Sequence, residues 1–170
     1  MKSLIKALFI GLAGWSLLAT SCAGARVGRS HSEDNLGIIP IGAAPRDTSI
    51  FVSSDCSREP TFADCSAQDA DGLQYVFFDG ALSRVSAAVP EVSRMLQLPA
   101  GMKFGESITD AAEKLRSAMD IELDRSVVQG GQIIYSSDFM LRSSAGILYS
   151  IEIASDENGR LIEVVERTDF

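Results

Sequence analysis

The sequence predicts an α+β fold in which one or two helices pack on an antiparallel β-sheet. One segment after residue 107 carries apolar residues at helical spacing. Several later runs are short and rich in β-branched and aromatic residues, and turn residues such as Asp79-Gly80 separate them. The composition, with 46% apolar and 22% charged residues, is that of a globular chain with one core.

The helix is predicted to begin after Ser107. Apolar side chains recur at i, i+4, i+7 and i+11, which places them in one stripe on a helix: Ile108, Ala112, Leu115 and Met119. Ser107 and Asp110 have the spacing of a capping box, in which the serine side chain bonds a backbone N–H of the first turn. We therefore expect Ser107 to cap this helix.

The strands are predicted as antiparallel hairpins. Asp79-Gly80 has the composition of a two-residue type I′ turn. The predicted strands are Leu73–Phe78, Ala81–Ala87, Ile147–Ala154 and Arg160–Arg167, with Gln132–Ser136 and Phe139–Arg142 as additions. In the first of them Tyr75 and Phe77 share one face, and Val76 and Phe78 share the other. Pro90 with the residues up to Gln97 is expected to form a short helix or turn.

A weak internal similarity suggests two units, residues 38–89 and 98–167. The run Ile39-Pro40-Ile41-Gly42 resembles Leu98-Pro99-Ala100-Gly101, and the turn at Gly80 resembles the turn at Gly159. Either the unit is duplicated, or two amphipathic hairpins simply look alike. In the first unit the segment from Asp47 to Ser54 is short and β-branched, so its helix is expected to be degenerate or absent.

The first 21 residues are predicted to be a signal peptide, with Lys2 and Lys6 before an apolar run that is short for a membrane span. The run ends in Leu17-Leu18-Ala19-Thr20-Ser21-Cys22, which resembles a bacterial lipobox. That resemblance implies that Cys22 carries the lipid. Cleavage by an ordinary signal peptidase after Ala23 or Ala25 is the alternative.

Residues 22–37 are small and polar and are expected to form a flexible tether, which places residues 38–170 in a single α+β domain. The only histidine of the chain, His31, lies in the tether. Removing residues 1–21 removes two lysines and no acids, so 13 basic and 23 acidic residues remain. This acidic balance argues against a nucleic-acid partner.

Two cysteines, Cys56 and Cys65, remain in the predicted domain. In an exported protein a disulfide between them is the expected state. A redox pair or a metal site is the alternative, but redox pairs have closer spacing and no histidine partner lies near.

No residue pattern for catalysis, cofactor or metal binding is found, so no catalytic residue, cofactor or metal ligand is assigned. Serines lack a nearby histidine base, and phosphate-binding glycine motifs are missing from the sequence. Asp120, Glu122 and Asp124 alternate along an extended run and are expected to form a solvated polar face. The acids at Asp69 and Asp156 lack the calcium-loop pattern.

The remaining candidate is a protein-binding surface around the disulfide loop and the first hairpin. The residues assigned to it are Phe62, Asp64, Tyr75 and Phe78. Exposed aromatic side chains beside acids are typical of contact surfaces between proteins.

Part of the chain resembles two known kinds of protein. The lipobox, the tether, the Pro-Ala-Gly-Met run before a helix and the strand pair that closes on Asn-Gly-Arg-Leu are similar to small outer-membrane lipoproteins of the SmpA/OmlA type. The same residues are similar to the tandem repeat of the β-lactamase inhibitor protein. This resemblance lies in residues Leu98–Ala118 and Ser144–Arg167, and it implies a shared fold and a function in binding other proteins. The Cys56–Cys65 pair departs from the usual pattern of the outer-membrane lipoproteins.

The sequence thus predicts an exported lipoprotein that binds or scaffolds proteins in the bacterial cell envelope, held at the outer membrane by its lipid and facing the periplasm. A soluble periplasmic or secreted form is the alternative location. An inhibitor or immunity lipoprotein that neutralises a hydrolase or toxin is the alternative function. A carboxylate-based enzyme is the least favoured.

Overall fold

The computed structural model describes residues 35–45, 48–56, 65–92 and 96–169. The predicted signal peptide, the lipidation site Cys22, nearly all of the tether, Phe62 and Asp64 lie outside the described residues. Within those four stretches, no helix is long and apolar enough to cross a membrane.

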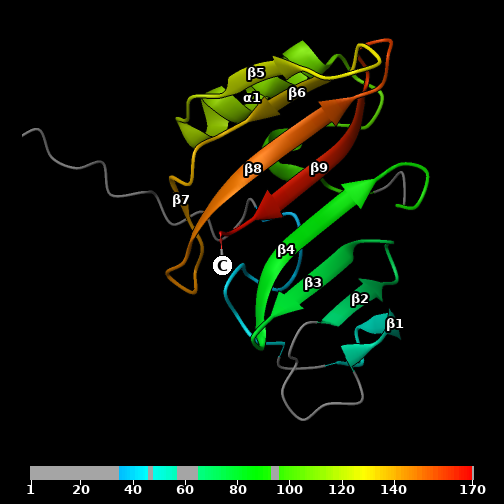
Figure 1. Cartoon of the computed structure of the whole chain (residues 1–170), viewed down its shortest axis with the longest axis vertical. Helices are drawn as coiled ribbons and strands as arrows, with labels where there is room; N and C mark the ends of the chain where they lie inside the picture. The colour runs from blue at the N-terminus through cyan, green and yellow to red at the C-terminus, as the bar shows by residue number, and fades with distance from the viewer. Residues whose placement is uncertain (1–34, 46–47, 57–64, 93–95, 170) are drawn as a thin grey trace, which may run out of the picture.

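The described chain forms a nine-stranded sheet in which all pairs are antiparallel (Figure 1). The strands are β1 (Phe51–Ser54), β2 (Cys65–Asp69), β3 (Gln74–Phe78), β4 (Ala81–Ala88), β5 (Asp124–Val127), β6 (Ile133–Ser136), β7 (Leu141–Arg142), β8 (Leu148–Ser155) and β9 (Leu161–Arg167). Their order is β1-β2-β3-β4-β9-β8-β6-β5, and β7 pairs with β8 off this path.

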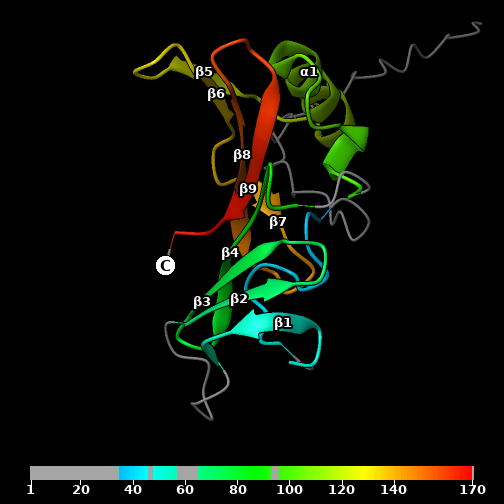
Figure 2. The same cartoon turned by 90° about the vertical axis from the view of Figure 1, so that its right-hand side faces the viewer.

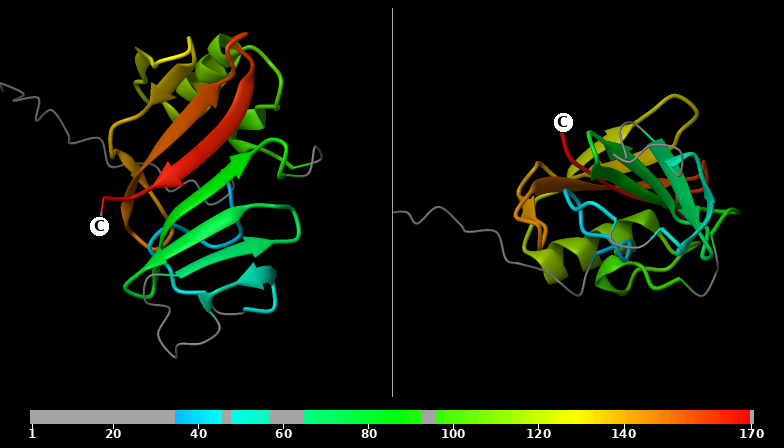
Figure 3. Two further views of the ribbon diagram at one scale, coloured as in Figure 1. Left: turned by 45° about the vertical axis from the view of Figure 1, so that its right-hand side comes forward. Right: turned by 90° about the horizontal axis from the view of Figure 1, so that it is seen from below.

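One α-helix, α1 (Ile108–Met119), packs on one face of the sheet, next to the short 3-10 turn η2 (Pro99–Gly101). Figure 2 shows the sheet nearly edge on with α1 on one side, and the right-hand view in Figure 3, from below, shows the same layering. The stripe predicted for this helix is buried, together with Ala111. The α+β prediction, with one helix on an antiparallel sheet, is therefore confirmed.

The two ends of α1 are built differently. Ser107 has the extended backbone of an N-cap residue, but its side chain makes no capping hydrogen bond, so the predicted capping box is wrong. At the other end Asp120 takes a left-handed conformation (φ 52°), and its N–H donates to the carbonyl oxygen of Arg116 at 3.0 Å. A left-handed residue in this position ends the helix.

Tight turns join the hairpins. Asp79 and Gly80 both have positive φ, as a type I′ turn requires, so that prediction is confirmed. The β2–β3 and β8–β9 turns share another design, in which an aspartate accepts two backbone N–H groups further along the same turn. Asp69 accepts from Asp71 and Leu73 at 3.0 Å each, and Asp156 accepts in the same way. Local acceptors of this kind favour turns.

The two halves of the sheet are related by an approximate two-fold axis. Each half contributes four strands, β1-β2-β3-β4 and β5-β6-β8-β9, and the halves meet at β4 and β9. In the first half Leu82 exchanges backbone hydrogen bonds with Gly42 and Ala43 (2.8 and 2.9 Å). In the second half Leu161 exchanges the same pair with Gly105 and Glu106 (2.8 and 2.9 Å).

The hydrogen bonds that join the halves obey the same relation. Val89 N–H donates to Ile162, and Thr168 N–H donates to Ser83, at 3.0 and 2.9 Å. Both strand pairs also shift register at equivalent places, just after Leu82 and Leu161, where Ser83 and Ile162 are the extra residues. The two-fold relation exchanges Ser86 and Val165, which are paired with each other across β4 and β9, so the axis passes between them. The two halves of the sheet therefore share one pattern of hydrogen bonds and register shifts.

The structure corrects the alignment of the two units. Gly42 corresponds to Gly105, each with positive φ in a turn, rather than to Gly101. The first half has no α-helix among its described residues. From Ala43 to Phe51 the chain advances by 8 positions, against 18 from Glu106 to Asp124, which leaves no room for a twelve-residue helix.

Most predicted strands are confirmed within a residue or two, but three of the observed strands, β1, β2 and β5, were not predicted. Of the segment Phe139–Arg142, only its last two residues form a strand. Pro90 follows a cis peptide bond and lies in a turn, and residues 93–95 lie outside the described part.

Candidate functional site: the open sheet face and the disulfide cleft

The sheet has one covered face and one face that no described helix or strand covers, which we call the open face. Alternation in each strand separates the two. In β3, Tyr75 and Phe77 are fully buried on the covered face, whereas Val76 and Phe78 are 39% and 48% exposed on the open face. The prediction that these pairs occupy opposite faces is confirmed.

The open face carries mostly polar side chains, several of them serines, and two of its residues, Ser150 and Val165, are only 3% and 4% exposed. The strand registers place these residues on it: Ser66, Gln68, Gln74, Val76, Phe78, Arg84, Ser86, Ala88, Asp124, Ser126, Ile134, Ser136, Ser150, Glu152, Ala154, Glu163, Val165 and Arg167. Two ion pairs cross it, Arg84 with Glu163 at 3.7 Å and Arg167 with Glu152 at 3.4 Å. Exposed ion pairs of this kind add little stability.

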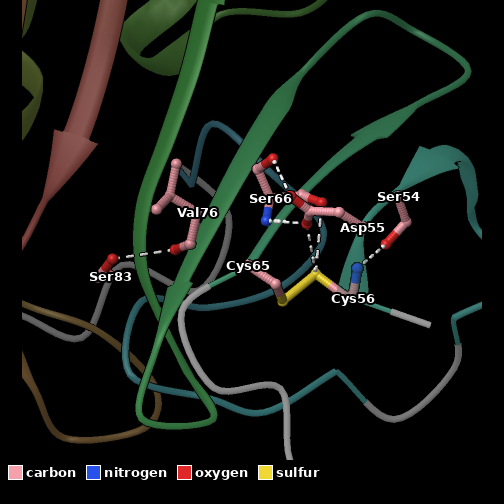
Figure 4. Close-up of a disulfide and its surroundings, with 7 residues drawn as sticks. All are labelled: Ser54, Asp55, Cys56, Cys65, Ser66, Val76 and Ser83. Carbon is pink, nitrogen blue, oxygen red and sulfur yellow. Dashed lines mark hydrogen bonds between the residues drawn. A yellow bond between two sulfur atoms is a disulfide. The ribbon is translucent and has the colours of Figure 1, made fainter. Parts of the chain in front are cut away.

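A cleft of about 400 Å³ opens at one border of the open face, beside the disulfide. Its lining residues are Asp55, Cys65, Ser66, Val76, Phe77, Phe78, Ser83 and Thr168. They come from the residue after β1, from strands β2, β3 and β4, and from the residue after β9. Figure 4 shows several of these side chains around the sulfur–sulfur bond.

The disulfide between Cys56 and Cys65 is present, as predicted, with Cα atoms 5.1 Å apart. It ties the chain just after β1 to the first residue of β2. Asp55 strengthens the junction, because its carboxyl oxygens accept the N–H and the hydroxyl of Ser66, and its own N–H donates to the Ser66 carbonyl at 3.1 Å (Figure 4). This wall of the cleft is therefore held in place by covalent and polar links.

The same residues do not make a metal site in this state. The ligand-type atoms of Asp55, Cys56 and Cys65 lie within 4.8 Å of one another. Both sulfurs are joined in the disulfide, and a metal ion requires thiolate sulfur. Only the Asp55 carboxyl group is left, and its oxygens already accept hydrogen bonds from Ser66.

The structure separates the four residues predicted for binding. Phe78 lies on the open face and lines the cleft. Tyr75 is fully buried, so its assignment to an exposed surface is wrong. Phe62 and Asp64 belong to the loop between Cys56 and Cys65, outside the described residues.

Tyr75 is buried because its hydroxyl has a partner inside the domain. The hydroxyl donates to Asp69 Oδ2 at 2.9 Å. Burial, followed by the hydrogen bond to Asp69, raises the pKa of Tyr75 well above its ordinary value. The ring also lies 5.4 Å from that of Phe51, in a tilted arrangement. Its role is structural.

Several cleft residues were not predicted from the sequence. Ser66, Ser83 and Thr168 are small polar residues without a motif, and the register brings them together from distant positions. Val76 could have been found, because it alternates with the buried Tyr75 and Phe77 and stands beside Phe78. Asp55 could have been noticed from its place next to Cys56.

The carboxylates considered for chemistry are dispersed. Asp120, Glu122 and Asp124 are exposed, in agreement with a solvated polar face. Asp156 lies at the β8–β9 turn, where hydrogen bonds from the backbone N–H groups, that of Arg160 first, lower the pKa of its carboxyl group. Both carboxyl groups that cap the turns, Asp69 and Asp156, thus have a structural use.

Comparison with family models, with curated proteins and with solved structures gave no match. The resemblance to small outer-membrane lipoproteins and to the β-lactamase inhibitor protein therefore stays a prediction.

Proposed function

We propose that this chain is an exported lipoprotein that acts as a protein-binding or scaffolding module in the bacterial cell envelope, with the open face as its contact surface. The observation that carries the proposal is the asymmetry of the sheet. One face packs on α1 and the core, and the other offers a broad polar surface bordered by exposed Val76 and Phe78.

The chemistry of that surface supports contact with a protein. Small side chains such as Ser86, Ser136 and Ala154 keep the surface shallow, so the backbone of a partner can approach closely. The exposed Phe78 ring and the neighbouring cleft supply an apolar anchor, and aromatic anchors in such positions contribute most to binding between proteins. The disulfide keeps this anchor point in a fixed shape before binding, which lowers the entropy lost on association.

The place of the module follows from the sequence prediction of a signal peptide and a lipid on Cys22. The acylated cysteine would stand at the end of a tether, which lets the domain reach partners while it stays at the membrane. Mass spectrometry of the chain recovered from membranes tests this part. A diacyl or triacyl mass on Cys22 is expected, and an N-terminus at Gly24 or Arg26 without lipid would contradict it.

A pair of matched substitutions tests the contact surface. Gln74→Arg places a long cation at an exposed position of the open face, and Ser117→Arg places the same side chain on the exposed side of α1. With a partner recovered by crosslinking from the envelope, Gln74→Arg should weaken binding at least about tenfold, roughly 1.4 kcal/mol. Ser117→Arg should leave binding unchanged. Equal effects of the two variants would exclude the open face as the contact surface.

A further inference from the structure

β5 is an edge strand whose outer side is unpaired in the described part of the chain. It forms hydrogen bonds with β6 alone, and its four side chains are all exposed. Val127 is 56% exposed, and Val128, which follows it, is 37% exposed. A sheet edge of this kind offers backbone donors and acceptors to another strand.

The register shows where the inner bonds lie. Val128 N–H donates to the carbonyl oxygen of Gln132 at 3.0 Å, so these two residues form a hydrogen-bonded pair at the turn. Bonded and non-bonded pairs alternate along an antiparallel ladder. Ser126 with Ile134 is therefore the next bonded pair toward the start of β5.

The residues of β5 that alternate with these bonded positions point their backbone N–H and C=O groups away from β6. Arg125 and Val127 are the non-bonded positions, opposite Tyr135 and Ile133. Ile133 N–H agrees with this assignment, because it donates to Ser155 Oγ on the side of β8 at 2.9 Å. The N–H and C=O groups of Arg125 and Val127 thus point out of the sheet edge, and no described residue bonds them.

The opposite edge of the sheet differs. β1 shifts its register against β2 between Phe51 and Ser53, and such a bulge disturbs the row of groups that another strand would need. β5 pairs with β6 without a register shift, and its sequence contains neither proline nor lysine, the residues that often protect an edge.

The charge near β5 indicates what could bind there. Asp120, Glu122 and Asp124 are exposed along the run that leads into the strand, and Arg125 is the one base among residues 120–127. An added strand that carries lysine or arginine at alternate positions would bring its charges beside these acids. A second copy of this chain would bring the same acids instead.

We propose that β5 binds an extended basic segment of a partner protein, which adds to the sheet as a further strand through the backbone groups of Arg125 and Val127. This inference rests on the proposed function in one respect: it names the kind of partner for a protein-binding module. The contact is made at the sheet edge, apart from the cleft at Phe78.

A synthetic peptide tests the proposal without knowledge of the natural partner. The probe is a heptapeptide of alternating Lys and Val with blocked ends. The control is the same peptide with N-methyl groups on alternate residues, which keeps its charge but removes backbone donors. Binding of the probe to the full chain should slow amide hydrogen exchange of Arg125 and Val127 at least about tenfold, because only paired amides are protected. Unchanged exchange at both amides, or equal binding of the control peptide, would overturn the proposal.

Substitution at the edge gives a second readout. Val127→Pro removes an outward N–H without breaking a bond to β6, whereas Val127→Thr keeps the N–H. Val127→Pro should lower the affinity for the probe at least about tenfold, and Val127→Thr should keep it. If Val127→Pro fails to fold, the exchange measurement on the unaltered chain decides. Full binding by a folded Val127→Pro variant would refute the edge as the site.

Three further outcomes are decisive. Self-association of the unaltered chain that Val127→Pro abolishes would identify a second copy as the occupant and overturn the proposed basic partner. An envelope partner whose binding responds to Gln74→Arg but not to Val127→Pro would support the open face while contradicting this inference. Probe binding at β5 with no effect of Gln74→Arg on an envelope partner would leave the inference supported and contradict the open-face contact.

Discussion

Replacing Asp69 by alanine should destabilise the domain far more than the same change at Asp156. Both aspartates cap a hairpin turn by accepting two backbone N–H groups. They differ in their surroundings. Asp69 is 8% exposed and also accepts the hydroxyl of Tyr75, whereas the donors to Asp156 lie in an exposed turn.

The size of the loss follows from the donors that Asp69→Ala leaves behind. Leu73 and Tyr75 are 2% and 0% exposed, so water cannot readily replace the lost acceptor. A buried donor without a partner costs about 1–3 kcal/mol, which gives about 2–6 kcal/mol for the two together. The N–H of Asp71 lies at an exposed residue and can bond water instead.

Urea denaturation of the oxidised protein, followed by circular dichroism, measures both variants against the unaltered chain. Asp69→Ala should lower the free energy of unfolding by the amount above, and Asp156→Ala should lower it much less. Similar losses in the two variants would refute the reasoning, because they would show that burial of the bonded donors does not set the cost.

Three further changes test other parts of the structure. The pKa of Tyr75 is raised in the folded chain, so the unfolded chain loses this proton first as the pH rises. The free energy of unfolding should therefore keep its full value below the unfolded pKa of about 10 and fall above it by up to about 1.4 kcal/mol per pH unit. Urea titrations at increasing pH measure this dependence, and Tyr75→Phe should flatten it. Asp120→Gly should raise the free energy of unfolding by about 1 kcal/mol, because glycine accepts the left-handed conformation and removes an acid from the helix C-terminus, whereas Asp110→Gly inside α1 should lower it. The double variant Cys56→Ser, Cys65→Ser should lose about 2–3 kcal/mol, the value expected for closing a short loop, and unchanged thermal stability would contradict a structural role for the bond.

The elements that could be predicted from the sequence are those whose burial repeats with a regular period. In α1 one stripe faces the core, and in β8 and β9 apolar residues recur on the buried side. β5 escaped prediction because all four of its side chains are exposed, so no alternation marks it. β1 was missed for a similar reason, since its burial pattern has no strict period.

The site was harder to predict than the fold. Alternation shows that Tyr75 and Phe78 lie on different faces, but not which face is covered. The acceptor that allows Tyr75 to be buried, Asp69, lies six positions earlier and gives no sequence signal of this pairing. The cleft itself joins Ser66, Ser83 and Thr168, which only the register of the folded sheet brings together.

The internal two-fold relation adds a reason for the asymmetry between the faces. Both units contribute equivalent strands, but only the second has the chain length to place a helix on the covered face. In the first unit Ile39 and Ile41 pack into the core instead, together with Leu36 just before the unit. The open face therefore continues across both units, and the ion pair of Arg84 with Glu163 spans the junction between them.

The most direct test of the central claim is site-specific photo-crosslinking in intact cells. A photoreactive residue at Gln74, on the open face, is compared with one at Glu113, on the exposed side of α1. We predict a discrete crosslinked protein from position 74, and no corresponding product from position 113. The substitution Phe78→Ser, at the other end of the same strand, should weaken the product from position 74. Crosslinks from position 113 alone, or equal patterns from both positions, would contradict the open face as the binding surface.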